Sequence, residues 1–362
     1  MRFAMRILRP QTVLISLLAA CWLAPTAEPA SSRANSEEFP LPVFELHSSF
    51  WINLHHTLYY EARQKKAANS REAGNSKPSA AKSVLPAKPS LTEVEQKAWD
   101  EAVAYYAENY AAKDLLFSTE LIELKDQLGD FEDCDELSGH KRKFCDAGLP
   151  PKLTQILEAA APVYRARLWQ DHDRANRNWI LHVAPLVREQ GVGISERLAD
   201  IYRTRWPHER IRVDVSAYAN AAGAYTTVDP LRVTISSLDP RNQGENSLDV
   251  LFHEGSHGIA EPVQAAIIRE CKQRDKPIPR DLWHALVLYT TAEIIRPALA
   301  SSTASSGNND GGSTPSSSSA LRERFAQRGW KEYLDLLQRF WQPYLDGRSS
   351  FDDAIARMVS SL

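Results

Sequence analysis

The chain has 362 residues, of which 43% are hydrophobic and 25% are charged. This length and apolar content suffice for one large folded domain or two ordinary ones, and nine Trp and twelve Tyr argue against disorder. The formal net charge is only -3, so no strong field of either sign favours nucleic acid as a partner.

Residues 1–27 have the pattern of a secretory signal peptide. Three arginines within the first nine residues precede the apolar run TVLISLLAACWLA, which is too short for a comfortable membrane span. The letters LAAC at 18–21 resemble a bacterial lipobox, which would place a lipid anchor at Cys21. Ordinary cleavage of the signal peptide a few residues after Cys21, without lipidation, is the favoured alternative. We therefore expect an exported protein, periplasmic or secreted, with no membrane span.

Composition divides the rest of the chain into segments. Residues 39–62 form an apolar N-terminal segment, and residues 63–92, rich in Lys, Ser, Ala and Pro, predict a flexible linker. Residues 93–209 have apolar side chains at helical spacing. The Gly/Ser-rich run 301–320 predicts a disordered loop, and residues 321–362 predict C-terminal helices.

The cysteines fit an oxidising compartment. Cys134 and Cys145 flank the short run DELSGHKRKF and predict a small loop closed by a disulfide. Cys271 is left over, and we expect it to be a buried small apolar residue rather than a nucleophile.

The pattern changes in the segment 210–300. The runs IRVDVSAY, AYTTV and LRVTISS alternate and are β-branched, which predicts three strands. Helical patterns follow, first around HEGSH and then in LWHALVLYTTAEIIRP. The chain is therefore predicted to be α+β, mainly helical, with a small sheet that precedes the HEGSH helix.

The motif HEGSH has the H-E-x-x-H spacing of a zinc site. On a helix, positions i and i+4 share a face, so His253 and His257 could bind one Zn²⁺. Glu254 points about 100° away and could act as general base on a water in the open coordination position. The alternative is a surface helix with incidental histidines. The strand-rich block before the motif favours the zinc site.

A catalytic zinc needs a third protein ligand. If the chain turns back near residue 275, an antiparallel return places Glu293 opposite His257, with His284 roughly 13 Å away along the same helix. Glu293 is therefore the favoured ligand and His284 the alternative. Tyr289, one turn before Glu293, could donate to the developing oxyanion, and His284 is a second candidate for that role.

HEGSH followed by a glutamate on a separate helix resembles the gluzincin metallopeptidases, of the broad thermolysin-like class. The resemblance covers roughly residues 210–297 and implies a sheet whose edge strand pairs with an extended substrate. The strands at 223–227 and 232–237 stand in the required order. Parts of the chain also resemble uncharacterised exported bacterial proteins, with which no function comes.

These observations predict an exported zinc-dependent hydrolase, a metallopeptidase acting on a peptide or protein substrate. Zn²⁺ would be held by His253, His257 and Glu293, with Glu254 as the general base. Two alternatives remain open: a non-catalytic envelope binding protein on a zincin-like scaffold, and a zinc amidase acting on cell-wall peptide. The sequence indicates neither the cleavage specificity nor the oligomeric state.

Overall fold

The computed structural model describes residues 42–72, 85, 90–244, 246–306 and 317–362. The predicted signal peptide with Cys21 lies outside these residues, and so do most of the predicted linker and the middle of the 301–320 run. All described residues belong to one compact unit, Pro40–Leu362. No helix in this described part is both long enough and apolar enough to span a membrane.

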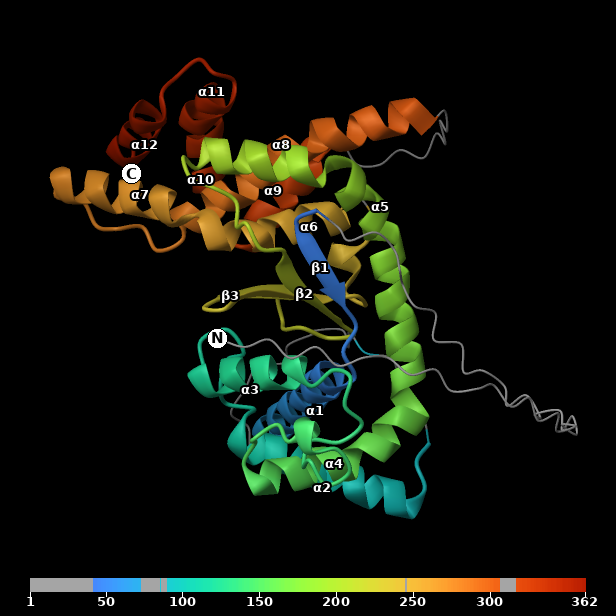
Figure 1. Cartoon of the computed structure of the whole chain (residues 1–362). Helices are drawn as coiled ribbons and strands as arrows, with labels where there is room; N and C mark the ends of the chain where they lie inside the picture. Colours follow the sequence, from blue (N-terminus) through green and yellow to red (C-terminus); the bar gives the residue numbers. More distant parts are fainter. Residues whose placement is uncertain (1–41, 73–84, 86–89, 245, 307–316) are drawn as a thin grey trace, which may run out of the picture. The chain divides into compact units, whose positions relative to one another are not determined.

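A four-stranded sheet lies between two groups of helices (Figure 1). The strand order is β1-β2-β4-β3, with β1 and β4 parallel to β2 and β3 antiparallel to β4. The three predicted strands are confirmed, and a fourth, β1, was not predicted. Their bounds are β1 (Phe44–His47), β2 (Ile211–Ser216), β3 (Ala224–Val228) and β4 (Leu231–Ser236).

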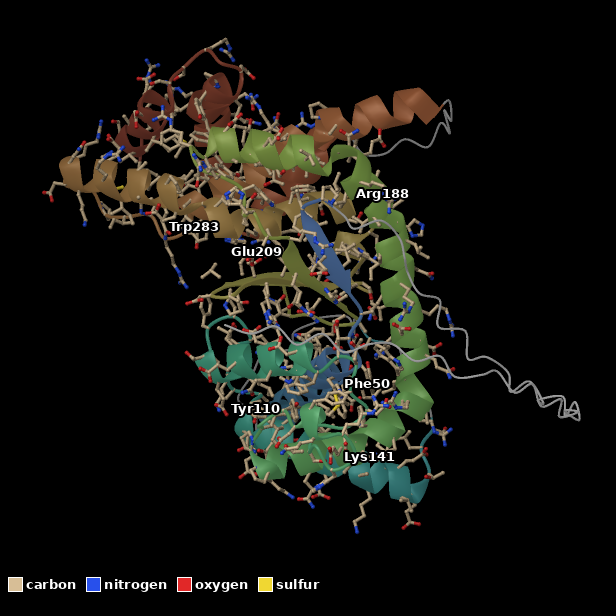
Figure 2. All side chains as sticks on the ribbon, in the orientation of Figure 1. Phe50, Tyr110, Lys141, Arg188, Glu209 and Trp283 are labelled. Atoms are coloured by element: carbon tan, nitrogen blue, oxygen red, sulfur yellow. A yellow bond between two sulfur atoms is a disulfide. The ribbon has the colours of Figure 1, made fainter. Side chains whose placement is uncertain are left out.

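The helices of the N-terminal half form a group on one face of the sheet. They are α1 (Phe50–Glu72), α2 (Glu93–Asn109), α3 (Thr119–Asp130) and α4 (Pro151–Tyr164). Helix α1 contacts β2, and the others pack around α1. Phe50 and Tyr110 belong to the hydrophobic core of this group (Figure 2). The segment 39–62 is therefore not separate from the body of the protein, because it supplies β1 and most of α1. Helix α1 also continues into the predicted linker.

The long helix α5 (Gln170–Ile201) leads from this group to the second one (Figure 1). The second group holds the other core and consists of α6 (Asn246–Ser256), α7 (Glu261–Gln273), α8 (Leu282–Ser306), α9 (Ser317–Gln327), α10 (Lys331–Leu336), α11 (Gln342–Leu345) and α12 (Phe351–Ser360). Short turns are η1 (Lys143–Cys145), η2 (Arg165–Trp169), η3 (Pro240–Asn242), η4 (His257–Ile259) and η5 (Leu337–Trp341). The predicted α+β class is confirmed.

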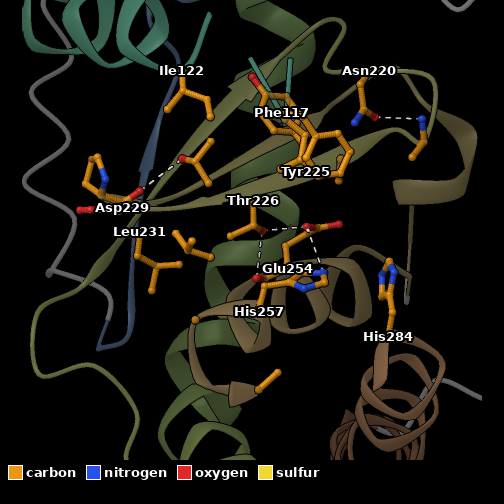
Figure 3. Close-up of a pocket in the computed structure, with 18 of the residues that line it drawn as sticks. Phe117, Ile122, Asn220, Tyr225, Thr226, Asp229, Leu231, Glu254, His257 and His284 are labelled. Atoms are coloured by element: carbon orange, nitrogen blue, oxygen red, sulfur yellow. Dashed lines mark hydrogen bonds and ion pairs between the residues drawn. The ribbon is translucent and has the colours of Figure 1, made fainter. Parts of the chain in front are cut away.

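Successive side chains along a strand point to opposite faces of the sheet, and each face is covered by one of the two cores. On β2, Val213 and Val215 belong to the core of the second group, whereas Arg212 turns to the other face and pairs with Glu132, which follows α3. Helix α6 packs beside β3, where the hydroxyl of Thr226 contacts Glu254 (Figure 3). The sheet therefore connects the HEGSH helix with the N-terminal helical group.

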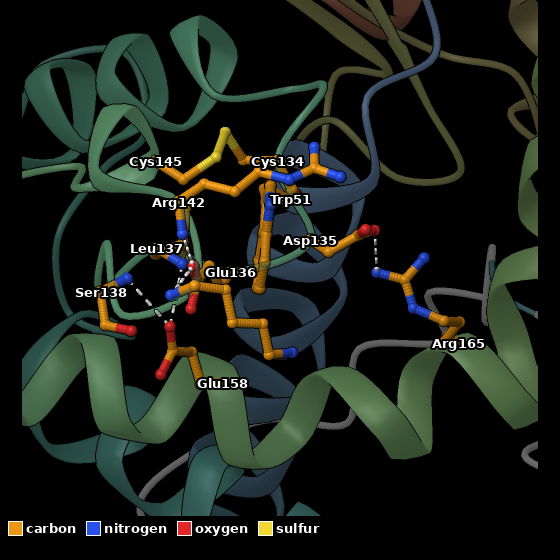
Figure 4. Close-up of a disulfide and its surroundings, with 11 residues drawn as sticks. Trp51, Cys134, Asp135, Glu136, Leu137, Ser138, Arg142, Cys145, Glu158 and Arg165 are labelled. Carbon is orange, nitrogen blue, oxygen red and sulfur yellow. Dashed lines mark hydrogen bonds and ion pairs between the residues drawn. A yellow bond between two sulfur atoms is a disulfide. The ribbon is translucent and has the colours of Figure 1, made fainter.

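The predicted disulfide between Cys134 and Cys145 is confirmed, with an S–S distance of 1.99 Å (Figure 4). Besides the turn η1, carboxylates hold the loop that the disulfide closes. Glu158 accepts hydrogen bonds from the backbone amides of Leu137 and Ser138, each at 2.9 Å, and Glu136 accepts from those at 141 and 142. Cys271 is a buried free thiol, as expected.

Burial of His172 predicts a loss of stability in acid. Burial lowers the pKa of this side chain from 6.5 to about 4, and its Nδ1 is hydrogen-bonded to the hydroxyl of Tyr164 at 2.9 Å. The stabilising contribution of the neutral ring is complete above the unfolded pKa of 6.5 and is lost as the pH falls toward 4. Between pH 7 and pH 5 we expect His172→Gln to lose about 2 kcal/mol less stability than the wild type, measured by urea unfolding. Equal losses in the two proteins would contradict this.

Candidate metal centre

The HEGSH motif lies at the buried end of α6. Leu251 and Phe252 anchor this helix in the core, and the next two residues, His253 and Glu254, are only 2% and 7% exposed. The α-helix ends at Ser256, so His257 begins the tighter turn η4. The rings of the two motif histidines still lie 5.0 Å apart between centroids. The motif is therefore interior, and the alternative of a solvent-facing surface helix is wrong.

Glycine at position 255 permits close packing of this helix. A Cβ atom there would lie 3.0 Å from the ring of Trp206 and 3.1 Å from the ring of Phe44 on β1. These distances are shorter than ordinary van der Waals contact, and aromatic rings in a packed core have little room to move. The absence of a side chain at Gly255 is thus what lets the motif helix approach β1.

Alanine at this position is expected to destabilise the protein by about 1 kcal/mol net. Overpacking costs about 1–3 kcal/mol, and the better helix propensity of alanine returns about 1 kcal/mol. Gly193, in the C-terminal third of α5, is a matched control, because its Cβ would meet nothing within 4 Å. Gly193→Ala should raise the unfolding free energy while Gly255→Ala lowers it. Stabilisation by both substitutions would show that the contact at Gly255 is not limiting.

Three imidazoles converge at this end of α6. The potential ligand atoms of His253, His257 and His284 all lie within 4.8 Å of one another. The Nε2 atoms of His253 and His284 are 3.1 Å apart, and the ring centroids of His257 and His284 are 4.9 Å apart. Ligand nitrogens about 2.0–2.1 Å from a tetrahedral metal lie about 3.3 Å from each other. The spacing therefore suits one shared ion.

The protonation state of the cluster also suits a metal. Burial lowers the pKa of His253 well below its usual value, lowers that of His257 to about 4 and that of His284 to about 3. The positive charge of Arg328 lowers all three further. All three imidazoles are thus neutral at ordinary pH, which is the form that binds a metal.

No family model, curated protein or solved structure matches this chain. What the site can do therefore follows from its own geometry. Three neutral imidazoles are donors that suit several transition metals, including zinc, copper, iron and nickel. The cluster alone does not select among them.

Glu254 faces the cluster. Its Oε2 lies 3.9 Å from Nε2 of His257 and accepts a hydrogen bond from Oγ1 of Thr226 at 2.7 Å (Figure 3). Burial raises the pKa of this carboxyl group to about 7, although the hydrogen bond from Thr226 and the charge of Arg328 act in the opposite direction. A group with such a pKa can accept and release a proton near neutral pH.

The cluster opens into a cavity of about 1420 Å³. One wall is β3 with the turn to β4, and another is α3 with the loop before it, where Phe117 and Ile122 contribute apolar side chains (Figure 3). Glu254, His257 and His284 line the cavity together with Arg328. Because β3 is the edge strand of the sheet, its backbone is available to an extended ligand in this cavity.

The structure does not bring Glu293 to the cluster. Its carboxylate pairs with Arg296 on the same helix, and His284 is the third residue beside the two motif histidines. Tyr289 is also directed elsewhere, since its hydroxyl donates to Oε1 of Gln342 at 2.6 Å. Neither Glu293 nor Tyr289 lines the cavity. The arrangement therefore corrects the expected positions of these two residues, and His284 rather than Glu293 completes the group of side chains that could hold a metal ion.

Glu293 lies away from the cluster because of the path that the chain takes after the motif. The antiparallel estimate assumed that α6 continues nearly straight to about residue 274. Instead, α6 ends at Ser256 and a new helix starts at Glu261, with Pro262 in its first turn. Helix α8 then packs its first turn against the motif, with the rings of Trp283 and His257 5.5 Å apart.

Sequence reasoning missed several residues around the cluster. Trp283 stacks on His284 at 5.3 Å between centroids, and Trp330 meets the same ring edge-on at 5.0 Å. Arg328 lies over the ring of Trp330 at 5.0 Å. Trp283 adjoins a predicted candidate and could have been noticed. Arg328 and Trp330 follow α9, and no local pattern connects them with the motif.

Proposed function

We propose that the protein is a zinc-dependent hydrolase, in the simplest case a metallopeptidase acting on a peptide or protein substrate. One observation carries the proposal: the buried carboxylate of Glu254 stands beside three neutral imidazoles at the wall of a large cavity. The third residue of the cluster is His284, whereas the resemblance to gluzincins implied a glutamate as the third ligand. We therefore propose HExxH chemistry without assigning that subfamily.

Each group would have a separate task in this reaction. His253, His257 and His284 would hold the zinc ion, which when bound supplies a Lewis acid that activates water and polarises a carbonyl group. Glu254 would take a proton from the attacking water and give it to the leaving amine. Arg328, which lines the same cavity, would place positive charge near the oxygen on which negative charge develops.

The shape of the cavity supports an extended substrate. An unpaired strand edge can add a further strand through main-chain hydrogen bonds, and β3 offers such an edge beside Glu254. Phe117 in the facing wall is 79% exposed and would cover an apolar side chain of the substrate. Binding through the backbone of β3 and through this wall would place one peptide bond of the substrate next to the metal centre.

Metal content and cleavage test the proposal together. We expect about one zinc ion per chain in the wild type and none in His253→Ala. We also expect cleavage of a quenched fluorescent peptide library that stops with a chelator and returns with Zn²⁺. Zinc binding without cleavage of any peptide would favour the envelope binding protein, and cleavage of cell-wall peptide amides alone would favour the amidase. No zinc under metal-replete conditions would refute both enzymatic forms of the proposal.

A further inference from the structure

The hydroxyl of Thr226 makes two contacts with a single residue. Oγ1 lies 2.7 Å from Oε2 of Glu254 and 2.9 Å from the backbone carbonyl oxygen of the same residue. Thr226 is on the edge strand β3 and is 6% exposed, and Glu254 is 7% exposed. Within the part of the chain that the structure describes, no other group hydrogen-bonds this carboxylate. Thr226 therefore supplies the hydrogen bond that this carboxylate accepts, and Nε2 of His257 lies 3.9 Å from the same oxygen.

Thr226 is well suited to hold a fixed direction. A β-branched side chain on a strand has few allowed rotamers. The backbone of Thr226 is also held in register opposite Val233 of β4. Glu254 has three rotatable side-chain bonds, and without a partner its carboxylate would sample several directions.

The two contacts also suit a carboxyl group that changes its protonation state. A threonine hydroxyl has one proton and two acceptor lone pairs. When Glu254 is ionised, the hydroxyl proton points to Oε2. When a proton arrives on Oε1, Oε2 still accepts from the hydroxyl. When the proton is on Oε2, that oxygen donates to Oγ1, and the hydroxyl proton turns to the carbonyl oxygen of Glu254.

We infer that Thr226 is a positioning residue for Glu254, which keeps this base directed at the metal centre through each cycle of proton uptake and release. The inference rests on the proposed function. In each cycle an O–H bond of water breaks, Glu254 gains that proton and then loses it to the leaving amine, and Thr226 ends unchanged. Because Thr226 belongs to the strand that would bind the substrate, it would also fix the position of the Glu254 carboxylate relative to the bound substrate.

Two variants separate the hydroxyl from the rest of the side chain. Thr226→Val keeps the branched shape and removes the hydroxyl, whereas Thr226→Ser keeps the hydroxyl. Thr57→Val is the matched control, because it removes another buried hydroxyl that donates to a backbone carbonyl, in α1 and away from the cavity lining. Zinc content and melting temperature are measured for all of them, and kcat and KM for the best-cleaved member of the quenched fluorescent peptide library.

We expect Thr226→Val to keep its zinc and its KM and to lose about 10–100-fold in kcat, the usual effect of removing a partner of an active-site group. Thr226→Ser and Thr57→Val should stay within about 3-fold of the wild type. A crystal structure of zinc-loaded Thr226→Val should find the Glu254 carboxylate turned from its wild-type direction, which is a readout independent of activity.

Several results would overturn the inference. These are an unchanged kcat in Thr226→Val, a serine variant as slow as the valine variant, or an unmoved carboxylate in the crystal structure. If Thr226→Val does not fold, a Thr226→Ser protein with normal zinc content and a kcat reduced more than about 10-fold would refute it instead. A wild-type protein that binds zinc and cleaves no peptide would refute the proposed function, whereas the carboxylate direction in Thr226→Val would still test the positioning.

Discussion

Replacing His284 with alanine is expected to abolish stoichiometric metal binding, whereas replacing Glu293 with alanine is not. His284 contributes one of three imidazoles within 4.8 Å of one another, and its Nε2 lies 3.1 Å from that of His253. Loss of a group that only supports a ligand costs about 10–100-fold in affinity, so loss of a ligand itself should cost at least ~100-fold. Competition with a chromophoric zinc chelator would measure the difference.

Glu293→Ala is the matched control for this experiment. It removes a side chain from the same helix α8, and the partner that it leaves, Arg296, is 40% exposed and can be solvated by water. We expect a zinc affinity within about 3-fold of the wild type, because removal of a partly exposed ion pair has small effects elsewhere. Zinc loss in Glu293→Ala with retention in His284→Ala would restore the original ligand assignment and contradict the cluster.

The strands illustrate what local pattern can predict. Alternating β-branched residues identified β2, β3 and β4. Side chains on the two faces of a strand have different surroundings, so the residue types alternate along its sequence. The strand β1, only four residues long, was missed. Phe44 pairs with Ile211, far along the chain, and such a short segment becomes a strand only through that distant partner.

Within the candidate site, too, local pattern predicts some residues and not others. His253, Glu254 and His257 were predicted because their spacing lies within one helical turn and needs no knowledge of the tertiary fold. The prediction of the third residue, Glu293 or His284, depended on where the chain turns after the motif. Pro262 was a visible signal for a new helix start, and a break at that point removes the basis of the antiparallel estimate.

Two residues near Glu254 could not be predicted from the sequence, because they come from elements outside any motif. Thr226 comes from the edge strand, and Arg328 from the loop after α9. Thr226 hydrogen-bonds Glu254 directly and Arg328 acts on it through its charge, but neither belongs to a motif with that residue. A sequence can therefore point to a candidate base by its motif and leave its surroundings undetermined, although burial and neighbouring groups decide the pKa of that residue.

Glu254→Gln is expected to keep the metal, to lose turnover by about 10²–10⁴-fold, and to be more stable than the wild type above neutral pH. Glutamine has nearly the same shape, and its amide oxygen can accept the hydrogen bond from Thr226, but it cannot take a proton from water. Zinc content and peptide cleavage, measured on the same preparation, test the first two effects. Activity comparable to the wild type would remove Glu254 from the mechanism.

The gain in stability follows from the sign of the pKa shift in the metal-free protein. Burial raises the folded pKa of Glu254 from 4.5 to about 7, so folding favours the protonated form. The carboxyl group is compatible with the folded state below its unfolded pKa of 4.5, and stability is lost as the pH rises through 7. At pH 8 we expect metal-free Glu254→Gln to exceed the wild type by roughly 3 kcal/mol, measured by urea unfolding. Lower stability of the variant at this pH would mean that the ionised carboxylate is well accommodated. Greater stability together with lost turnover would identify Glu254 as a residue kept for its chemistry at the expense of the fold.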